Sequence, residues 1–218
     1  MNPFSAVLRW TEWGPPEGDP VVCVHGLTRT GRDFDALARH LAARGRRVIC
    51  PDVFGRGESQ WLPEGDMYVV PTYVVGMAPM LAAIGRPYDW VGTSMGGIIG
   101  MSVAALPTNH LRRLVINDVG PFIPAAALAN IASYLSLEVS FGSVVEVEAH
   151  LRRIHAPFGP LTDAQWRHLA ETSSRATAMA ARALETLCQP AMGRCRPSIR
   201  CVSPFWITTS KRAPSGPI

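Results

Sequence analysis

The sequence carries little charge and almost no lysine. Only 17% of its 218 residues are charged, and Lys211 is the one lysine among 21 basic residues. No basic run exceeds two residues, and aromatic residues do not alternate with the arginine pairs. Proteins that bind nucleic acids usually gather positive charge on one face or along one helix. A net charge of +4 spread in this way predicts no nucleic-acid partner.

Cysteine is scarce, and its spacing excludes the common cysteine-based sites. The five cysteines lie at positions 23, 50, 188, 195 and 201, without a C-x-x-C pair. An odd count without close pairs argues against a disulfide framework and against a zinc site. The glycine loops also lack a dinucleotide-binding G-x-G-x-x-G with its distant acidic residue, and a Walker-type Gly-Lys. We therefore expect no metal and no other cofactor.

Long hydrophobic runs are absent as well. Each apolar stretch is broken by Pro, Gly or a charged residue before it could span a bilayer. The first residues, MNPFSAVLRWTEWG, show no basic region followed by an apolar core, so no signal peptide is predicted. Hydrophobic residues still make up 47% of the chain, which is typical of a folded soluble domain. We expect a cytoplasmic protein without a membrane partner; the sequence leaves its oligomeric state open.

Short apolar runs alternate with helical patterns over the first 120 residues. The predicted strands are 20–26, 46–52, 88–94 and 111–120, and the predicted helices are 32–45, 72–84 and 95–106. This alternation is typical of parallel strands joined by crossover helices. Residues 5–14 are predicted to add one antiparallel edge strand or hairpin arm. The predicted fold class is therefore α/β, a mostly parallel sheet flanked by helices.

The pattern changes after Pro121. Residues 124–135 place apolar side chains on one helical face, and 162–171 opens with a Thr-x-x-Gln capping box. Beyond about residue 180 neither a strand period nor a helical period is present. We therefore predict three parts: a core over 1–121, a helical cap insertion over 122–180, and an irregular tail over 181–218.

The stretch WVGTSMGG, residues 90–97, carries the strongest chemical signal. Gly92-Thr93-Ser94-Met95-Gly96 matches the G-x-S-x-G of a nucleophile elbow, in which a serine lies on a sharp turn from a strand into a helix. Gly and Ser are common in loops, so the pentapeptide by itself is a weak signal. Its place between a predicted strand and a predicted helix makes the functional interpretation much stronger.

Two further loops reinforce this interpretation: VHGLTRTGRDF follows the strand at 20–26, and PDVFGRGES follows the strand at 46–52. With NDVGPFIP after the last strand, their order and spacing resemble the α/β-hydrolase fold superfamily, in particular bacterial single-domain serine esterases with a helical cap. The resemblance implies that Ser94 is the nucleophile, and that the backbone N–H groups of Leu27 and Met95 form an oxyanion hole. It implies a small-molecule acyl or ester substrate. The glycines that would shape the elbow and the oxyanion loop are Gly26, Gly92 and Gly96.

The catalytic base is the missing part of this pattern. A serine hydroxyl needs a base, and in this superfamily the order along the chain is Ser, then Asp or Glu, then His. The histidines after Ser94 fall in predicted helices or at the start of a strand; they are His110, His150, His155 and His168. Asp118, at the carboxyl end of the strand predicted over 111–120, is the one candidate acid, and its alternative interpretation is a carboxylate that caps its own turn. His25 is expected to shape its loop rather than to titrate.

The missing histidine and the change in composition after residue 180 suggest one cause. We hypothesise that the reading frame shifts at around residues 176–185, which would leave the family core incomplete at its carboxyl end; a genuine short variant is the alternative. Resequencing should reveal the shift, whereas an unbroken frame with a tail shared by close relatives would contradict it. The predicted strand at 111–120 would then be an exposed edge, lined by Leu114, Val115 and Ile116.

Two functions follow from these observations. The first is a serine hydrolase that cleaves a carboxylic ester or related acyl bond through an acyl-enzyme on Ser94. The alternative is a catalytically dead fragment or pseudoenzyme that keeps the elbow and lacks the triad histidine.

Overall fold

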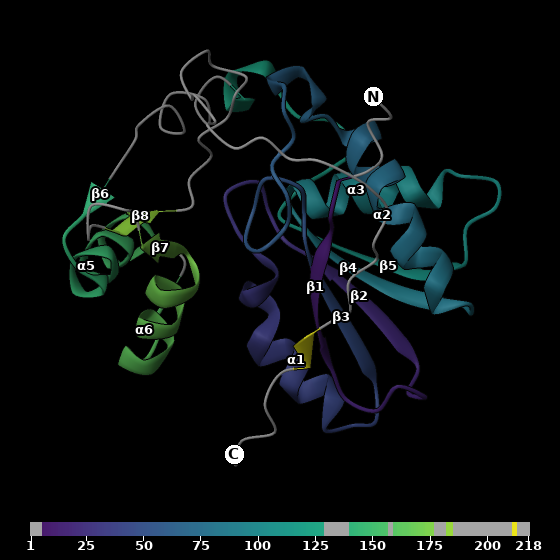
Figure 1. Ribbon diagram of the computed structural model, residues 1–218, viewed down its shortest axis with the longest axis horizontal. Helices are drawn as coiled ribbons and strands as arrows, with labels where there is room; N and C mark the ends of the chain where they lie inside the picture. Colours follow the sequence, from purple (N-terminus) through teal and green to yellow (C-terminus); the bar gives the residue numbers. More distant parts are fainter. Residues whose placement is uncertain (1–5, 129–139, 157–158, 177–181, 185–210, 213–218) are drawn as a thin grey trace. The chain divides into compact units, whose positions relative to one another are not determined.

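The computed structural model describes residues 6–128, 140–156, 159–176, 182–184 and 211–212 (Figure 1). These residues belong to two compact units. The first combines Met1–Pro124 with Gln189–Ile218, and the second is Ala125–Cys188. The division predicted from sequence at residues 121 and 180 stays a prediction, and most of the predicted tail lies outside the described residues.

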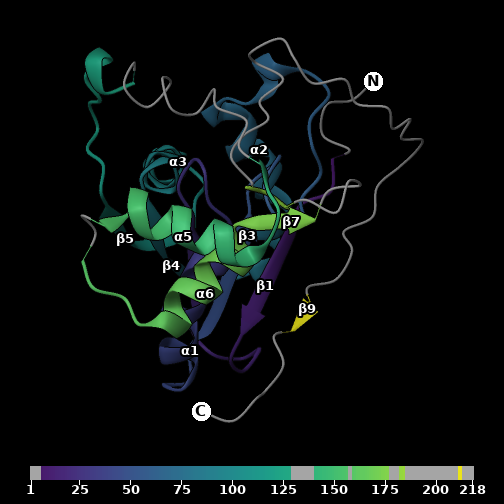
Figure 2. The same ribbon diagram turned by 90° about the vertical axis from the view of Figure 1, so that its left-hand side faces the viewer.

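A mostly parallel sheet forms the centre of the first unit. Its strands are β1 (Arg9–Trp13), β2 (Pro20–Val24), β3 (Arg47–Asp52), β4 (Tyr88–Thr93), β5 (Leu111–Asn117) and β9 (Lys211–Arg212). They lie in the order β5-β4-β2-β3-β1-β9, and only β1 against β3 is antiparallel. The α/β fold class predicted from sequence is confirmed. The antiparallel pairing predicted for residues 5–14 is confirmed by β1 against β3. The prediction of β1 as an edge strand is wrong, because two residues of β9 pair with its other side (Figure 2).

Helices cover both faces of this sheet. The single-turn helix η1 (Gly31–Phe34) leads into α1 (Asp35–Ala42), and α2 (Val70–Ile84) and α3 (Met95–Ala104) follow later in the chain. Val21 and Cys23 of β2 pack in the cluster that holds Ala38 of α1, whereas Val22 and Val24 pack in the cluster of α2 and α3. Successive residues of a strand point to opposite faces. The helix α1 therefore covers one face, and α2 and α3 cover the other.

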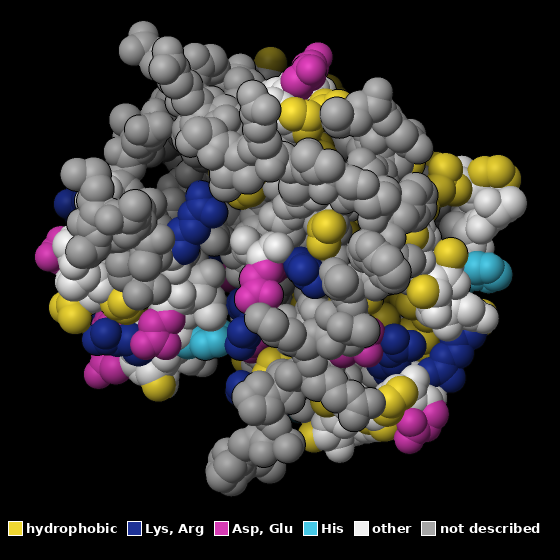
Figure 3. Space-filling model, in the orientation of Figure 1, with side chains coloured by type: hydrophobic (Ala, Val, Ile, Leu, Met, Phe, Trp, Pro, Cys, Tyr) yellow, Lys and Arg dark blue, Asp and Glu magenta, His cyan; other side chains and the backbone are white. Residues whose placement is uncertain are grey.

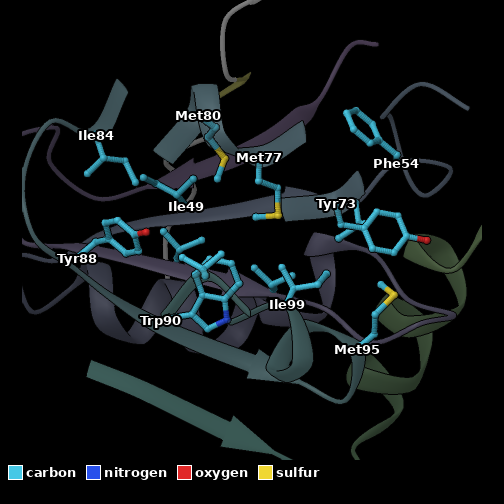
Figure 4. Packing of buried hydrophobic residues seen from close by; sticks show 14 of the residues in the cluster. Ile49, Phe54, Tyr73, Met77, Met80, Ile84, Tyr88, Trp90, Met95 and Ile99 are labelled. Atoms are coloured by element: carbon cyan, nitrogen blue, oxygen red, sulfur yellow. The ribbon is translucent and has the colours of Figure 1, made fainter. Parts of the chain in front are cut away.

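The larger of the two clusters surrounds Trp90, which is fully buried. Its indole N–H donates to the carbonyl of Gly96, 3.0 Å away, and so ties the centre of β4 to the first turn of α3. Figure 4 shows Phe54, Tyr73 and Met95 at one end of this cluster. Met95 directly follows the predicted nucleophile, so this end of the core supports the site described below.

An ion cluster joins β4 and β5 near their amino ends. The carboxylate of Asp89 accepts hydrogen bonds from Arg112 (2.9 Å) and from Arg46 (2.6 Å). These bonds, chiefly those from Arg112, lower the pKa of Asp89 to about 2. The cluster lies at the opposite end of β4 from Ser94, so its charges stabilise the sheet without entering the site.

The second unit contains two helices, α5 (Val144–Ile154) and α6 (Asp163–Thr172), and a small antiparallel sheet of β6 (Ser140–Phe141), β7 (Ser174–Ala176) and β8 (Arg182–Leu184). The capping box at the start of α6 is confirmed: Thr162 accepts from Gln165 N–H, and the Gln165 side chain accepts from Thr162 N–H at 2.8 Å. The sequence analysis missed this sheet, because strands of two or three residues are too short to show a period of two. The helix predicted over 124–135 falls largely on residues outside the described part.

In the described part of the sheet, β5 is an edge strand, as predicted. Val115 is 54% exposed and Ile116 is 38% exposed, whereas Leu114 is partly buried against the core cluster. The prediction that all three side chains line an exposed edge is therefore wrong for Leu114. Among the described residues, no helix is long and apolar enough to cross a bilayer.

Candidate active site

Ser94 lies on the turn between β4 and α3, with backbone angles of φ 50° and ψ −116°. It is one of two non-glycine residues with positive φ in the described part of the chain. Such a conformation is costly for a residue with a side chain, and it persists only where its surroundings enforce it. Here the N–H of Ser94 donates to the carbonyl of Asn117 on β5, and its own carbonyl accepts from Gly97 N–H, both at 2.8 Å. The strained conformation is thus held from both sides.

Two glycines give this turn the room it needs. A Cβ atom on Gly92 would lie 2.3 Å from the carbonyl oxygen of Gly96, and a Cβ atom on Gly96 would lie 2.0 Å from the carbonyl oxygen of Val24. Real Cβ atoms do not approach backbone this closely, so neither position accepts a larger residue without movement of a strand. The two glycines let α3 begin directly against β2 and β4.

Two backbone donors lie beside Ser94. Met95 is the first residue of α3, and the first N–H groups of a helix have no partner within the helix. The helix dipole adds partial positive charge at this end. Gly26 lies against Ser94 from the other side, since a Cβ atom on Gly26 would be 3.7 Å from the Ser94 Cβ. This contact brings the peptide group between Gly26 and Leu27 to the elbow.

His25 fixes that peptide group and is fully buried. Its Nδ1 donates to the carbonyl of Gly26 at 2.7 Å, and its Nε2 accepts from the N–H of Val53 at 2.9 Å. Because Nε2 must be an acceptor, the ring is the neutral Nδ1–H tautomer. Both ring nitrogens are occupied, so His25 has no free nitrogen to take a proton from Ser94. Its geometry agrees with the loop-shaping role expected from the sequence.

Burial lowers the pKa of His25 from 6.5 to about 4. The unfolded chain therefore binds a proton at this residue as the pH falls through about 6.5, whereas the folded chain does not do so until about pH 4. We expect the free energy of unfolding to decrease by about 3 kcal/mol over this range on account of His25 alone.

The measurement is urea unfolding at about pH 7 and about pH 4 for the wild type and for His25→Asn. The variant removes the titrating ring and should lose this part of the pH dependence, while the carboxylates contribute equally to both proteins. An equal change with pH in the two proteins would contradict the expectation.

Asp118 directly follows β5 and has a φ of 60°. Its neighbour Asn117 pairs with Thr93, the residue before Ser94, so the carboxylate lies at the same end of the sheet as the elbow. The side chain is exposed. The backbone of Asp118 therefore lies near that of Ser94, at the carboxyl end of the neighbouring strand. The role of Asp118 as the catalytic acid stays a prediction.

In the first unit, His110 is the one histidine that follows Ser94 in the sequence. His110 precedes β5, and its carbonyl accepts from Tyr88 N–H at the start of β4, at the opposite end from Ser94. His150, His155 and His168 belong to α5, its end and α6 in the second unit. The described part of the first unit therefore holds a candidate nucleophile and two candidate amide donors, and its one downstream histidine lies at the other end of the sheet.

Asp52 and Arg56 hold the loops of the site, and neither was predicted from the sequence. Asp52, at the end of β3, accepts from Gly31 N–H at 2.7 Å and from Glu58 N–H at 3.0 Å, and so joins the loops that follow β2 and β3. Arg56 is also buried and donates to the carbonyl of Leu27. The sequence signal for Arg56 was a single arginine between two glycines in the loop after a buried strand. Its role could not be predicted from this signal, because its partners Leu27 and Tyr73 come from distant segments.

Neither metal-binding groups nor surface charges of one sign are concentrated among the described residues. Across the described residues, no group of three or more His, Cys, Asp or Glu side chains could hold a metal ion. On the face drawn in Figure 3, basic and acidic side chains of the described residues are interspersed rather than gathered by sign.

Comparison with known proteins gives a consistent picture. A family model described as "alpha/beta hydrolase fold" matches residues 19–138. A 3-hydroxybutyrate-oligomer hydrolase of Cupriavidus necator is 49% identical over 164 residues, which cover 74% of this chain and 56% of that protein. A mouse sn-1-specific diacylglycerol lipase, ABHD11, is 32% identical over 102 residues, covering 46% of this chain and 33% of its own.

Solved structures show the same similarity. A structure from Rickettsia typhi superposes with a TM-score of 0.78 at 32% identity, covering 85% of this chain and 65% of the other. An alpha/beta hydrolase from Novosphingobium aromaticivorans superposes with a TM-score of 0.74 at 25% identity, covering 89% of this chain and 75% of the other. The chain spans about half, or less, of the length of the two curated relatives named above.

Proposed function

The chain belongs to the α/β-hydrolase fold family, and we propose that it is a serine hydrolase that cleaves a carboxylic ester or related acyl bond through an acyl-enzyme on Ser94. The observation that carries the proposal is the strained φ of 50° at Ser94, between a strand and a helix. Strain of this kind gathers at functional sites, because it exposes a reactive group in a fixed direction. A serine that served only to cap α3 would use its side chain, and Ser94 makes no side-chain cap bond.

The proposed reaction uses the groups around the elbow. The Ser94 hydroxyl attacks the carbonyl carbon, and its proton passes to a base as the tetrahedral intermediate forms. The N–H groups of Met95 and Leu27 donate to the resulting oxyanion, where the loss of one donor typically costs about 100- to 1000-fold in rate. The intermediate collapses to the acyl-enzyme as the C–O bond to the alcohol breaks, and the alcohol leaves with the proton held by the base. Water then hydrolyses the acyl-enzyme to the acid and free Ser94. Asp118 is proposed as the acid that orients the base. The second unit, Ala125–Cys188, is proposed as the cap.

The substrate class proposed first is a short ester of a hydroxy acid. Its support is the printed name of the Cupriavidus necator relative, a 3-hydroxybutyrate-oligomer hydrolase, with 49% identity. The mouse relative, named a diacylglycerol lipase, supports the broader class of carboxylic esters. In both cases the bond broken would be an ester, which suits a serine nucleophile.

Trapping of the acyl-enzyme tests this proposal. The protein is mixed with p-nitrophenyl butyrate or with a fluorophosphonate, quenched in acid, digested and analysed by mass spectrometry. We expect the added mass on the peptide that contains Ser94. Dimers and trimers of 3-hydroxybutyrate are then tested as substrates by quantifying the released acid. A folded protein that carries no label on Ser94 with either reagent would contradict the proposal.

The alternative is a catalytically dead fragment or pseudoenzyme. The observation that favours it is the lack of a histidine with a free ring nitrogen beside Ser94 in the described part of the first unit. Without a base, Ser94 would be no more nucleophilic than an ordinary serine. The trapping experiment separates the two functions, because a dead fragment would keep its fold and take up no label.

A further inference from the structure

The guanidinium of Arg56 is a buried cation beside the oxyanion loop. The reaction proposed above gives this cation no role. The residue lies in the loop after β3, between Gly55 and Gly57, and is only 1% exposed. No carboxylate pairs with it in the described part of the chain, and its Nη2 has no hydrogen-bond partner there. Burial of an unpaired charge opposes folding. The placement therefore calls for a role other than stability.

Three segments meet at this guanidinium. Its Nε donates to the carbonyl of Leu27 at 3.0 Å, and its Nη1 donates to the carbonyl of Phe54 at 2.7 Å and to the hydroxyl of Tyr73 at 3.0 Å. The guanidinium carbon also lies 5.8 Å from the ring centroid of Tyr68 and 5.5 Å from that of Tyr73. The rigid fork thus joins the oxyanion loop to the loop after β3 and to α2.

The bond to Leu27 has a geometric consequence for the candidate donor. Two peptide groups flank Leu27, and the carbonyl of the first, on Gly26, is held by His25. The carbonyl of the second, on Leu27, is held by Arg56. In a trans peptide the N–H points opposite to the C=O of the same group. The Leu27 N–H belongs to the first peptide group, so His25 sets its direction through the Gly26 carbonyl. Arg56 holds the next peptide group and so restricts rotation of the backbone at Leu27.

We propose that Arg56 is a positioning residue: by holding the peptide group that follows Leu27 it keeps the Leu27 N–H, whose direction His25 sets, turned toward the oxyanion, and it supplies positive charge behind this loop; this rests on the serine hydrolase function proposed above. The charge acts on the same loop where negative charge would develop, in a dry environment without a described carboxylate to offset it. A donor that is already oriented needs no rearrangement as the intermediate forms. Arg56 itself does not touch the substrate.

Lysine cannot replace arginine in this role. An ammonium is a compact charge without a planar fork, so it cannot donate to Leu27, Phe54 and Tyr73 at the same time with the geometry seen here. Arg56→Lys therefore keeps the charge and removes the orientation. Tyr73→Phe is the milder variant, because it removes the hydroxyl that accepts from Arg56 and keeps the aromatic ring. Arg46→Lys is the matched control, since Arg46 binds Asp89 at the other end of the sheet.

The experiment has two readouts on the full chain. Hydrogen–deuterium exchange with mass spectrometry follows the peptide that covers residues 25–30 and a reference peptide from β4. Steady-state kinetics with p-nitrophenyl butyrate give kcat and KM separately. Exchange reports on the loop whether or not the protein turns over, so failure of this inference and failure of the proposed function are distinguishable.

We expect Arg56→Lys to speed exchange at residues 25–30 about tenfold or more, and to lower kcat about 10- to 100-fold with KM changed less than about threefold. Tyr73→Phe should shift both quantities in the same direction by less, and keeps the test decisive if Arg56→Lys does not fold. Arg46→Lys should change neither. Unchanged exchange in both Arg56→Lys and Tyr73→Phe, or a raised KM with unchanged kcat, would overturn the proposal. A wild type without turnover would count against the hydrolase function, while exchange would still decide whether Arg56 holds the loop.

Discussion

Replacement of Ser94 by alanine is expected to remove enzyme-dependent turnover of p-nitrophenyl butyrate, a loss on the order of 1000-fold or more in kcat. The hydroxyl at the elbow is the nucleophile of the proposed reaction, and alanine keeps the Cβ atom while it removes the attacking oxygen. Amide donors that remain at Met95 and Leu27 can polarise the ester, but they cannot form the acyl-enzyme. The measurement is the initial rate of p-nitrophenol release by purified protein, with acetate and butyrate esters compared.

Ser102→Ala is the matched control for this change. Ser102 lies on the same helix, α3, is partly buried, and its hydroxyl donates to the carbonyl of Ile98 at 3.0 Å. Its loss should leave turnover within about twofold of the wild type, because surface-type substitutions away from the site have small effects. If Ser94→Ala and the wild type hydrolyse the esters at equal rates, the turnover does not come from the elbow and the proposed function is wrong.

Gly96→Ala is expected to lower the free energy of unfolding by about 3 kcal/mol or more. The added methyl group would lie 2.0 Å from the carbonyl oxygen of Val24, which is backbone of a central strand and cannot rotate away. Relief requires α3 to move off β2, and this movement would disturb the bond from Trp90 to the Gly96 carbonyl. Urea or thermal unfolding followed by circular dichroism measures the loss.

Gly26→Ala provides the comparison at a second buried glycine. A methyl group there would meet Ser94 and Thr93 at 3.7 Å, which is ordinary van der Waals contact. We expect its free energy of unfolding to stay within about 1 kcal/mol of the wild type. Equal stability of Gly96→Ala and Gly26→Ala would show that α3 does not begin as tightly against β2 as the structure has it.

The histidine at position 25 shows what local reasoning can reach. A histidine at the end of a buried run, followed by glycine, was expected to shape its loop. The ring bonds to Gly26 and Val53 agree with that expectation. The tautomer could not be predicted, because it depends on a backbone N–H contributed by a loop 28 positions further along the chain. The lowered pKa could not be predicted either, because it comes from complete burial of the ring, which only the assembled fold provides.

Periodicity and glycine placement were enough to predict the alternation of strands and helices in the first 120 residues, and the position of Ser94 at a strand-to-helix junction. These features depend on residues a few positions apart, so they can be predicted from the sequence itself. Asp118 was predictable in the same way as a residue after the last strand. Its role, like that of Ser94, depends on a base that local patterns did not reveal.

Only the tertiary structure decided which segments meet. It placed β9 beside β1, built a small sheet from strands of two or three residues, and turned Leu114 toward the core. It also brought the buried Arg56 to the carbonyl of Leu27, across 29 positions of sequence. The physical reason is the same in each case: a hydrogen bond or an apolar contact between distant segments exists only after the sheet has assembled, so no local pattern encodes it.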